Sequence, residues 1–217
     1  MPKSEYSDLR NQIIAGCRLM QQQGLILGTA GNISVRVDDG LLLTPTGIAY
    51  DDLVPEQIVQ MNWDGTFAGD VLPTSEWRFH RDILAARSDL NAVVHTHSRN
   101  ATAVSILNRD IPPIHYMIAA AGGASIRCSG YATFGTQELS DLALAALSGR
   151  RACLLAHHGV IAAHASLDEA LTLAQTVEEL AALYLACLGT GEVPVLGQSE
   201  IDVVVQKYES YGQQKPG

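Results

Sequence analysis

Two histidines stand two positions apart at the end of an apolar run, in the stretch AVVHTHS of residues 92–98. Side chains alternate along a strand, so His95 and His97 would point to one face and Thr96 to the other. Two converging imidazoles could hold a metal ion, since histidine nitrogens and carboxylate oxygens bind zinc. The pair alone is equally typical of two partly exposed histidines at a strand end, so a metal site needs further ligands.

A second pair of histidines follows another apolar run, in LLAHHGV of residues 154–160. Because neighbouring residues of a strand face opposite ways, one of His157 and His158 can join the first pair, but not both. Gly159 would let the backbone turn or a ligand approach closely, which slightly favours His158. Cys153 offers a softer ligand, but its place deeper in the strand predicts a core residue.

Glu76 is a candidate for acid/base chemistry, in the stretch PTSEWRFHRDILAAR of residues 73–87. This stretch predicts a turn, an N-cap at Thr74 or Ser75 and an amphipathic helix with Glu76 in its first turn. A carboxylate there is stabilised by the helix N-terminus, so a purely structural role is the plainer interpretation. Beside a metal, the same group could ligate the ion and exchange protons with a substrate.

Three polar turns, GTAGN, TPTG and PTSE, suggest phosphate binding. Backbone N–H groups and hydroxyls can hold a phosphate without a lysine. Each turn alone is weak evidence, and GTAGNIS lacks the spacing of a dinucleotide fingerprint or a P-loop. The candidate residues are Gly31, Asn32, Thr46, Gly47, Thr74 and Ser75.

Two tyrosines, Tyr116 and Tyr211, could supply a phenol as an acid or a hydrogen-bond donor. A tyrosine at the end of a strand or helix more often packs amphipathically, so spacing selects neither.

Composition excludes some classes of partner. With 14 basic and 23 acidic residues the net charge is −9, which argues against a nucleic-acid partner. Four widely spaced cysteines without a CxxC pair predict buried thiols of a reducing compartment. No signal-peptide core or bilayer-spanning apolar run is evident, so we expect a cytoplasmic protein with no membrane partner.

The order of elements predicts one α/β domain over residues 1–217, with a mixed central sheet covered by helices. A helix should run from Ser4 to about residue 23, and a long one should open with a capping box from Ser166 to Glu169 and close at Gly189. Residues 112–135 are predicted as strands separated by glycine turns, and ACLLAHHGVIAA as one strand. A mobile tail is expected from about residue 205.

Seven segments, in order along nearly the whole chain, together resemble the class II aldolase/adducin family. They are GTAGNISVR, LLLTPTGIAY, PTSEWRFH, AVVHTHS, AVSILNRDIPPIHYMIAAAGG, YATFGTQELS and LLAHHGVIA. The resemblance implies that family's three-layer fold and an aldolase cleaving a ketose 1-phosphate through a metal-stabilised enediolate. It leaves open a 4-epimerase, a dehydratase or a decarboxylase of a sugar phosphate, and less readily a non-catalytic adducin-like binding domain.

The resemblance also assigns roles to individual residues. It implies one Zn²⁺, or another divalent metal, per subunit, with Glu76 as a ligand in the empty site and as general acid/base during turnover. It places phosphate against Asn32, Thr46, Gly47, Thr74 and Ser75, with Thr74 standing where the family usually has a serine. The implied metal ligands are Glu76, His95, His97 and His158.

The remaining implied roles belong to aromatic residues. Tyr116 and Tyr211 would lie beside the substrate, Tyr116 reaching across a subunit boundary of a homotetramer, and Phe134 would line the aldehyde pocket. The resemblance therefore implies active sites at subunit interfaces.

Overall fold

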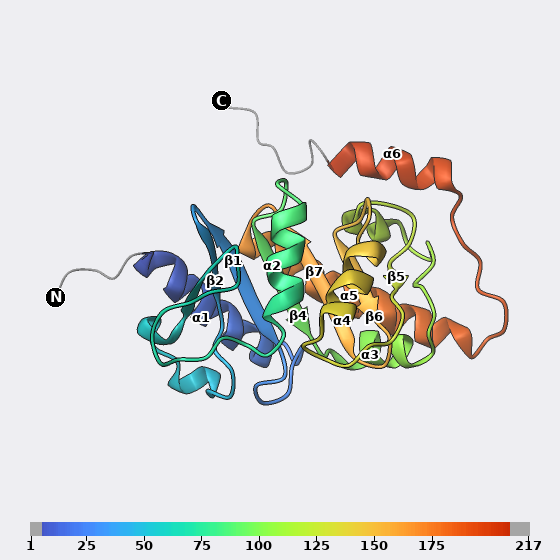
Figure 1. Cartoon of the computed structure of the whole chain (residues 1–217). Coiled ribbons are helices and arrows are strands. Elements are labelled where there is room, and N and C mark those ends of the chain that lie inside the picture. The colour runs from blue at the N-terminus through green and yellow to red at the C-terminus, as the bar shows by residue number, and fades with distance from the viewer. Residues whose placement is uncertain (1–5, 209–217) are drawn as a thin grey trace, which may run out of the picture.

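A seven-stranded mixed sheet lies at the centre of the computed structural model, which describes residues 6–208 (Figure 1). The strand order is β3-β2-β1-β4-β7-β6-β5, and neighbours are antiparallel except β5 and β6, which are parallel. The expected mixed sheet is therefore confirmed. The strands are β1 (Asn32–Val37), β2 (Gly40–Leu43), β3 (Val59–Asn62), β4 (Ala92–Thr96), β5 (Arg127–Cys128), β6 (Ala152–Leu155) and β7 (Gly159–His164).

Helices cover both faces of this sheet, and its central strands are therefore buried on both sides. Along β4, Val94 packs into the apolar cluster shared with α1 and α5, whereas Val93 packs into the cluster shared with α2 and α4. The fold is thus three-layered, and His95 lies on the α2 and α4 side. The helices are α1 (Ser7–Gln22), α2 (Trp77–Ala86), α3 (Arg99–Ile106), α4 (Gln137–Ala146), α5 (Leu167–Leu188), α6 (Gln198–Tyr208) and the 3-10 helices η1 (Tyr50–Asp52), η2 (Pro55–Gln57) and η3 (Tyr116–Ala121).

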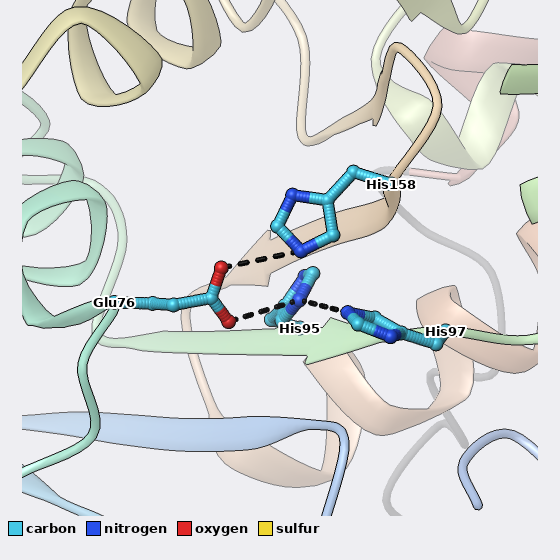
Figure 2. Close-up of side chains that lie close together, drawn as sticks. All are labelled: Glu76, His95, His97 and His158. Carbon is cyan, nitrogen blue, oxygen red and sulfur yellow. Dashed lines mark hydrogen bonds and ion pairs between the residues drawn. The ribbon is translucent and has the colours of Figure 1, made fainter. Parts of the chain in front are cut away.

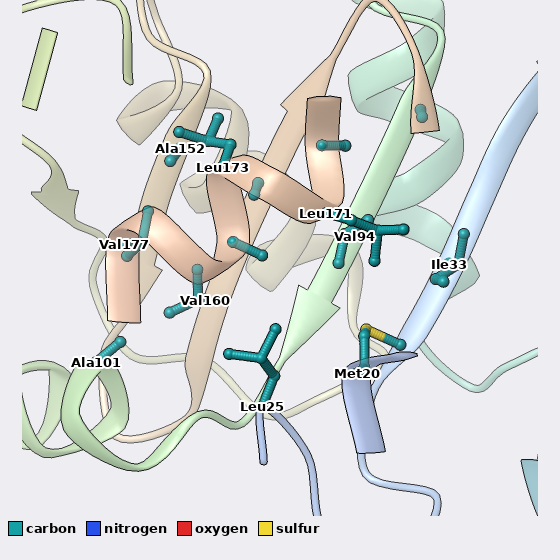
Figure 3. Close-up of a cluster of buried hydrophobic side chains, with 14 of the residues drawn as sticks. Met20, Leu25, Ile33, Val94, Ala101, Ala152, Val160, Leu171, Leu173 and Val177 are labelled. Atoms are coloured by element: carbon teal, nitrogen blue, oxygen red, sulfur yellow. The ribbon is translucent and has the colours of Figure 1, made fainter. Parts of the chain in front are cut away.

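Helix α5 is the principal core helix. Leu171, Leu173 and Val177 point toward the sheet, near Val94 and Val160 (Figure 3). By length and composition alone α5 could cross a membrane. Its packing on β4 and β7 accounts for its apolar character without one.

The two ends of α5 follow the expected pattern. The Ser166 hydroxyl accepts the backbone N–H of Glu169 at 3.3 Å and donates to the Glu169 carboxylate at 2.7 Å. The helix stops at Leu188, before Gly189. Both signals were local, which is why they could be found in the sequence.

Residues 112–135 differ from the prediction. Residues Tyr116–Ala121 form the 3-10 helix η3 instead of a strand, and β structure there is limited to β5 and a bridge between Ile111 and Ile126. The His115 ring accepts the N–H of Met117 at the start of η3, and Gly122 ends it in the left-handed region. A short buried apolar run does not reveal its own periodicity, so strand and helix look alike in sequence.

The helices near the two ends of the chain have bounds that differ from the expected ones. Helix α1 begins at Ser7, and the expected cap Ser4 lies outside the described residues. Helix α6 continues through Tyr208, so residues 205–208 of the expected tail are helical, and the mobility of the tail stays a prediction.

Candidate metal centre and active site

Four side chains from three parts of the fold converge on one point (Figure 2). Glu76 directly precedes α2, His95 lies in β4 and His97 follows that strand's last residue, while His158 lies in the turn between β6 and β7. One possible ligand atom from each lies within 4.8 Å of all the others. The structure therefore brings together all four residues proposed as metal ligands.

His95 is oriented by the backbone of the neighbouring strand. Its ring Nδ1 lies 2.8 Å from the carbonyl oxygen of Val160, which can only accept, so Nδ1 carries the hydrogen. The other ring nitrogen, Nε2, faces Glu76 Oε2 at 3.2 Å and His97 Nε2 at 2.9 Å, so it is the atom that His95 could offer to a metal. A backbone-anchored histidine with a free ring nitrogen is the usual arrangement of a metal ligand.

The choice between His157 and His158 depends on a turn. ACLLAHHGVIAA forms a hairpin of β6 and β7 rather than the single strand that was predicted, so alternation along a strand does not decide the matter. His157 adopts a left-handed conformation with φ of 56°, and its ring lies 3.0 Å from the Asn108 amide nitrogen, whereas His158 faces the cluster. His158 is therefore still preferred as the metal ligand, but the reason is the geometry of this turn and not alternation along a strand.

Gly159 makes room for this arrangement. A Cβ at this position would lie 2.4 Å from the carbonyl oxygen of Thr96 and 3.0 Å from a ring carbon of His97. Any larger residue would push the β6–β7 turn away from β4 and separate His158 from the other two histidines.

Glu76 is the N-cap residue of α2 and not part of its first turn, which corrects the predicted cap at Thr74 or Ser75. The Thr74 hydroxyl accepts the backbone N–H of Glu76 at 3.3 Å, which holds the turn before the helix. The Glu76 side chain makes no capping hydrogen bond. Its carboxylate is therefore free to point into the histidine cluster.

The environment keeps this carboxylate charged. Burial would raise the pKa of Glu76, but the nearby His95 and His158 outweigh it and hold the pKa well below the usual range. Burial, followed by the charges of the other histidines, lowers the pKa of His97 to about 3. Three rings and one ionised carboxylate thus form the cluster.

A divalent cation fits these donors. Glu76 Oε1 is buried, lies 3.2 Å from His158 Nε2 and has no hydrogen-bond partner among the described residues. Leaving such an oxygen unsatisfied is costly, and a cation would satisfy it. Neutral imidazoles with a carboxylate are ligands typical of zinc and related metals.

A cavity of about 430 Å³ opens above the cluster. Every residue proposed for substrate binding lines it, including Phe134, and no described lysine or arginine does. A bound phosphate would then depend on N–H groups, hydroxyls and the cluster itself for its stabilisation. The lining residues are Thr29, Ala30, Gly31, Asn32, Pro45, Thr46, Gly47, Thr74, Ser75, Glu76, His97, Tyr131, Ala132, Phe134, His157 and His158.

Of the two proposed catalytic tyrosines, the structure describes only Tyr116. Tyr116 lies on η3, is 52% exposed and does not line the cavity of its own chain. Tyr211 lies outside the described residues. A single chain therefore presents the metal cluster and cavity but brings neither phenol to them among its described residues.

Several residues near the cluster were missed in the sequence. His80 and Ser34 are fully buried and hydrogen-bonded to each other behind Asn32, and Tyr131 and His157 form part of the cavity wall. A signal for the first two existed, because Glu76 and His80 stand four apart and Asn32 and Ser34 two apart. Those spacings place each pair on one face of a helix and of a strand.

Comparisons with known proteins show which family this chain resembles. Residues 11–185 match the family described as the class II aldolase and adducin N-terminal domain. An L-fuculose phosphate aldolase of Escherichia coli O6:H1 is 55% identical, covering 96% of this chain and 97% of the relative. A 5-methylthioribulose-1-phosphate/5-deoxyribulose-1-phosphate aldolase of Rhodospirillum rubrum is 51% identical, with coverage of 98% and 96%.

A solved structure supports the same assignment at the level of the fold. An L-fuculose 1-phosphate aldolase superposes with a TM-score of 0.92 at 34% identity, covering 96% of this chain and all of the other. The chain belongs to the class II aldolase and adducin family. It is an enzyme of the aldolase class, a carbon–carbon lyase, and a sugar-phosphate substrate is implied by the homology.

Proposed function

We propose that this chain is a zinc-dependent aldolase that reversibly cleaves L-fuculose 1-phosphate to dihydroxyacetone phosphate and L-lactaldehyde. The observation that carries the proposal is the cluster of Glu76 with three histidines beneath a cavity of substrate size. The relative of that name is 55% identical over nearly its full length.

The residues of the cavity favour metal chemistry over a Schiff base. Aldol cleavage must stabilise negative charge beside a carbonyl, which enzymes achieve with a lysine imine or with a metal. Lys207 is the one lysine among residues 6–208; it lies on α6 and does not line the cavity. A divalent cation held by His95, His97, His158 and Glu76 would supply a Lewis acid for charge developing on the ketose oxygens.

Phosphate would lie against the three polar turns. Thr46, Gly47 and Ser75 are exposed and line the cavity, and Glu76, the N-cap residue of α2, directly follows Ser75. Asn32 already donates one amide hydrogen to Glu76, which leaves its second amide hydrogen for a phosphate oxygen. Thr74 keeps its hydroxyl hydrogen for the same purpose while its oxygen accepts from the Glu76 N–H.

Glu76 would act as the acid and base at C3. In the cleavage direction the C4 hydroxyl loses a proton, the C3–C4 bond breaks, and Glu76 delivers a proton to C3 to complete dihydroxyacetone phosphate. Tyr116 of a neighbouring subunit would receive the C4 proton, with Tyr211 close by. Synthesis reverses these steps.

The exposed position of Tyr116 supports an assembly. A phenol that is 52% exposed on its own chain could reach a neighbour's cavity, so we propose a homotetramer with active sites at subunit interfaces. We further propose that the enzyme acts in fucose catabolism in the cytoplasm.

A second substrate assignment is favoured by a specific observation. The relative named for 5-methylthioribulose 1-phosphate and 5-deoxyribulose 1-phosphate is 51% identical, close to the 55% of the fuculose enzyme. All three ketose 1-phosphates contain C1 to C3 of dihydroxyacetone phosphate and differ beyond C3. The cluster and the phosphate turns would serve each of them equally.

One comparison tests both assignments. Purified metal-loaded enzyme is given L-fuculose 1-phosphate, 5-deoxyribulose 1-phosphate and 5-methylthioribulose 1-phosphate, with dihydroxyacetone phosphate as the measured product. The highest kcat/KM is expected for L-fuculose 1-phosphate. A higher value for either pentulose would replace the assigned substrate, and no cleavage of any of them would reject the aldolase proposal.

A further inference from the structure

A buried chain of hydrogen bonds ends on Glu76. Ser34 and Asn32 lie two apart on β1 and so face α2 together, and His80 of α2 lies between them. The His80 ring contacts Ser34 Oγ through Nδ1 at 2.8 Å and Asn32 Oδ1 through Nε2 at 2.5 Å. Asn32 Nδ2 then donates to Glu76 Oε2 at 2.9 Å.

The direction of each hydrogen bond follows from the Glu76 end. An ionised carboxylate only accepts, so the amide atom that faces it must be Nδ2, and Oδ1 must face His80. Because Oδ1 only accepts, His80 Nε2 must carry a hydrogen. Burial lowers the pKa of His80 to about 3, so its Nδ1 is bare and accepts the Ser34 hydroxyl.

This chain fixes the Asn32 amide in one of its two orientations. If the amide were turned over, Oδ1 would face the Glu76 carboxylate, which places two acceptors against each other. The amide N–H would face the N–H of His80, which places two donors against each other. All four residues are at most 6% exposed, so water does not relieve such a mismatch. The orientation of Asn32 therefore depends on the donor of His80.

Glu76 depends on Asn32 in turn. Oε2 is held by the Asn32 amide and faces His95, while Oε1 is left without a hydrogen bond and faces His158. A carboxylate that must both ligate a metal and move a proton needs one oxygen held and one free.

We propose that His80 is a positioning residue for Glu76, acting through Asn32 to hold one carboxylate oxygen and leave the other free. This inference rests on the proposed role of Glu76 in the aldolase reaction. Ser34 supports it by donating its hydroxyl hydrogen to His80 Nδ1 at 2.8 Å, which helps hold the ring in place.

Two substitutions at position 80 separate this role from simple core filling. His80→Gln places an amide N–H close to the former Nε2 and keeps a donor for Asn32. His80→Asn is nearer in reach to Nδ1 and loses that donor. Loss of such supporting partners at a metal site typically costs about 10- to 100-fold in affinity or activity.

We therefore expect kcat of His80→Asn to fall about 10- to 100-fold with KM changed far less, and His80→Gln to recover most of the loss. Cobalt(II) binding gives a readout that does not need turnover: the visible spectrum and Co²⁺ affinity should change in His80→Asn and stay near wild type in His80→Gln. Ser34→Ala, a smaller change, should show a weaker version of the same effects.

Ser140→Ala is the matched control. It removes a buried 2.7 Å hydrogen bond to α2, at Asp82, without touching the chain to Glu76. It should lower stability while leaving kcat and the Co²⁺ spectrum unchanged.

The outcomes distinguish this inference from the proposed function. If wild type cleaves no ketose 1-phosphate, the aldolase proposal fails, while the Co²⁺ comparison still tests the role of His80. If wild type is active but His80→Asn, His80→Gln and Ser34→Ala match it in kcat and Co²⁺ spectrum, the inference is overturned. Equal losses in His80→Asn and His80→Gln would also overturn it, because the donor would then not matter.

Discussion

The two ends of the active-site cavity are built differently. At the floor, Glu76 and His95 are 6% and 0% exposed, and their positions are set by a helix start and a central strand. At the rim, Tyr131 and Phe134 are 62% and 63% exposed and lie in the loop between β5 and α4. The floor is held by buried hydrogen bonds to residues of the sheet, whereas the rim is formed by exposed aromatic side chains.

This difference matches the parts of the proposed substrates. The ketose 1-phosphates named for the relatives share the C1 to C3 portion and differ in the aldehyde portion. A buried and preorganised floor suits the part that never changes, and exposed loop residues suit the part that does. The comparison predicts that changes at the floor affect the chemical step and changes at the rim affect the choice of substrate.

Removal of the metal should have the largest effect. Lewis-acid stabilisation of developing charge is worth several kcal/mol, so chelation should lower kcat/KM by about 10⁴-fold for every substrate alike. Metal content and turnover are measured before and after dialysis against a chelator, and after Zn²⁺ is restored. Unchanged turnover in metal-free protein would contradict the role assigned to the floor.

Glu76→Gln should follow in magnitude. It keeps the size of the side chain and removes the base, so both kcat and exchange of the C3 proton of dihydroxyacetone phosphate should fall about 10³-fold. Exchange into deuterated water, followed by NMR, measures this without any aldehyde. Exchange at the wild-type rate would exclude Glu76 as the base.

His158→Ala and His157→Ala compare a floor residue with its rim neighbour in the chain. His158→Ala should weaken Zn²⁺ binding by about 100-fold, whereas His157→Ala should leave it nearly unchanged, since His157 turns away from the cluster. Competition with a chromophoric chelator measures both affinities. The opposite ranking would mean that the wrong histidine has been assigned to the metal.

The floor could be predicted from sequence where local rules decide. Alternation along a strand put His95 and His97 on one side, whereas the role of Glu76 came from the family resemblance, because a carboxylate at a helix start is by itself more plainly structural. His158 was favoured through Gly159, although the turn that presents it was taken for a strand. Short turns inside apolar runs leave too little signal to be seen.

The remaining features depend on contacts between distant segments. His80 and Asn32 are 48 residues apart, and no local pattern shows that their side chains meet. Residues Tyr116–Ala121 form a 3-10 helix, which the periodicity of a short apolar run does not distinguish from a strand. The proposed place of Tyr116 depends on a second chain and so stays a prediction.

Acid should lower the free energy of unfolding of the chain, and part of this effect should come from His80. The pKa of His80 is about 3 in the folded chain, because of burial, and near 6.5 when unfolded. The unfolded chain takes up a proton between these values and the folded chain does not, so this stability is present above about pH 6.5 and is lost as the pH falls.

His80→Gln should therefore flatten the pH dependence. Between pH 7.5 and pH 5, the free energy of unfolding should fall in both proteins. The fall should be larger in the wild type than in the variant, by up to about 2 kcal/mol. Urea unfolding of the metal-free proteins at pH 5 and at pH 7.5 measures this. Equal slopes in His80→Gln and wild type would show that His80 does not stay neutral in the folded chain.

Substitution at the rim should have the smallest effect and the most selective one. Phe134→Ala or Tyr131→Ala would remove the proposed apolar contact with the aldehyde portion, and contacts of that kind are worth about 1–3 kcal/mol in discrimination. The ratio of kcat/KM between L-fuculose 1-phosphate and 5-methylthioribulose 1-phosphate should change about tenfold, since the two differ in bulk only beyond C3. Proton exchange at C3 of dihydroxyacetone phosphate, which has no aldehyde portion, should stay within about twofold of wild type. If the rim variants lowered that exchange as much as they changed the ratio, the two ends of the cavity would not act separately, and substrate choice would have to be sought at the floor.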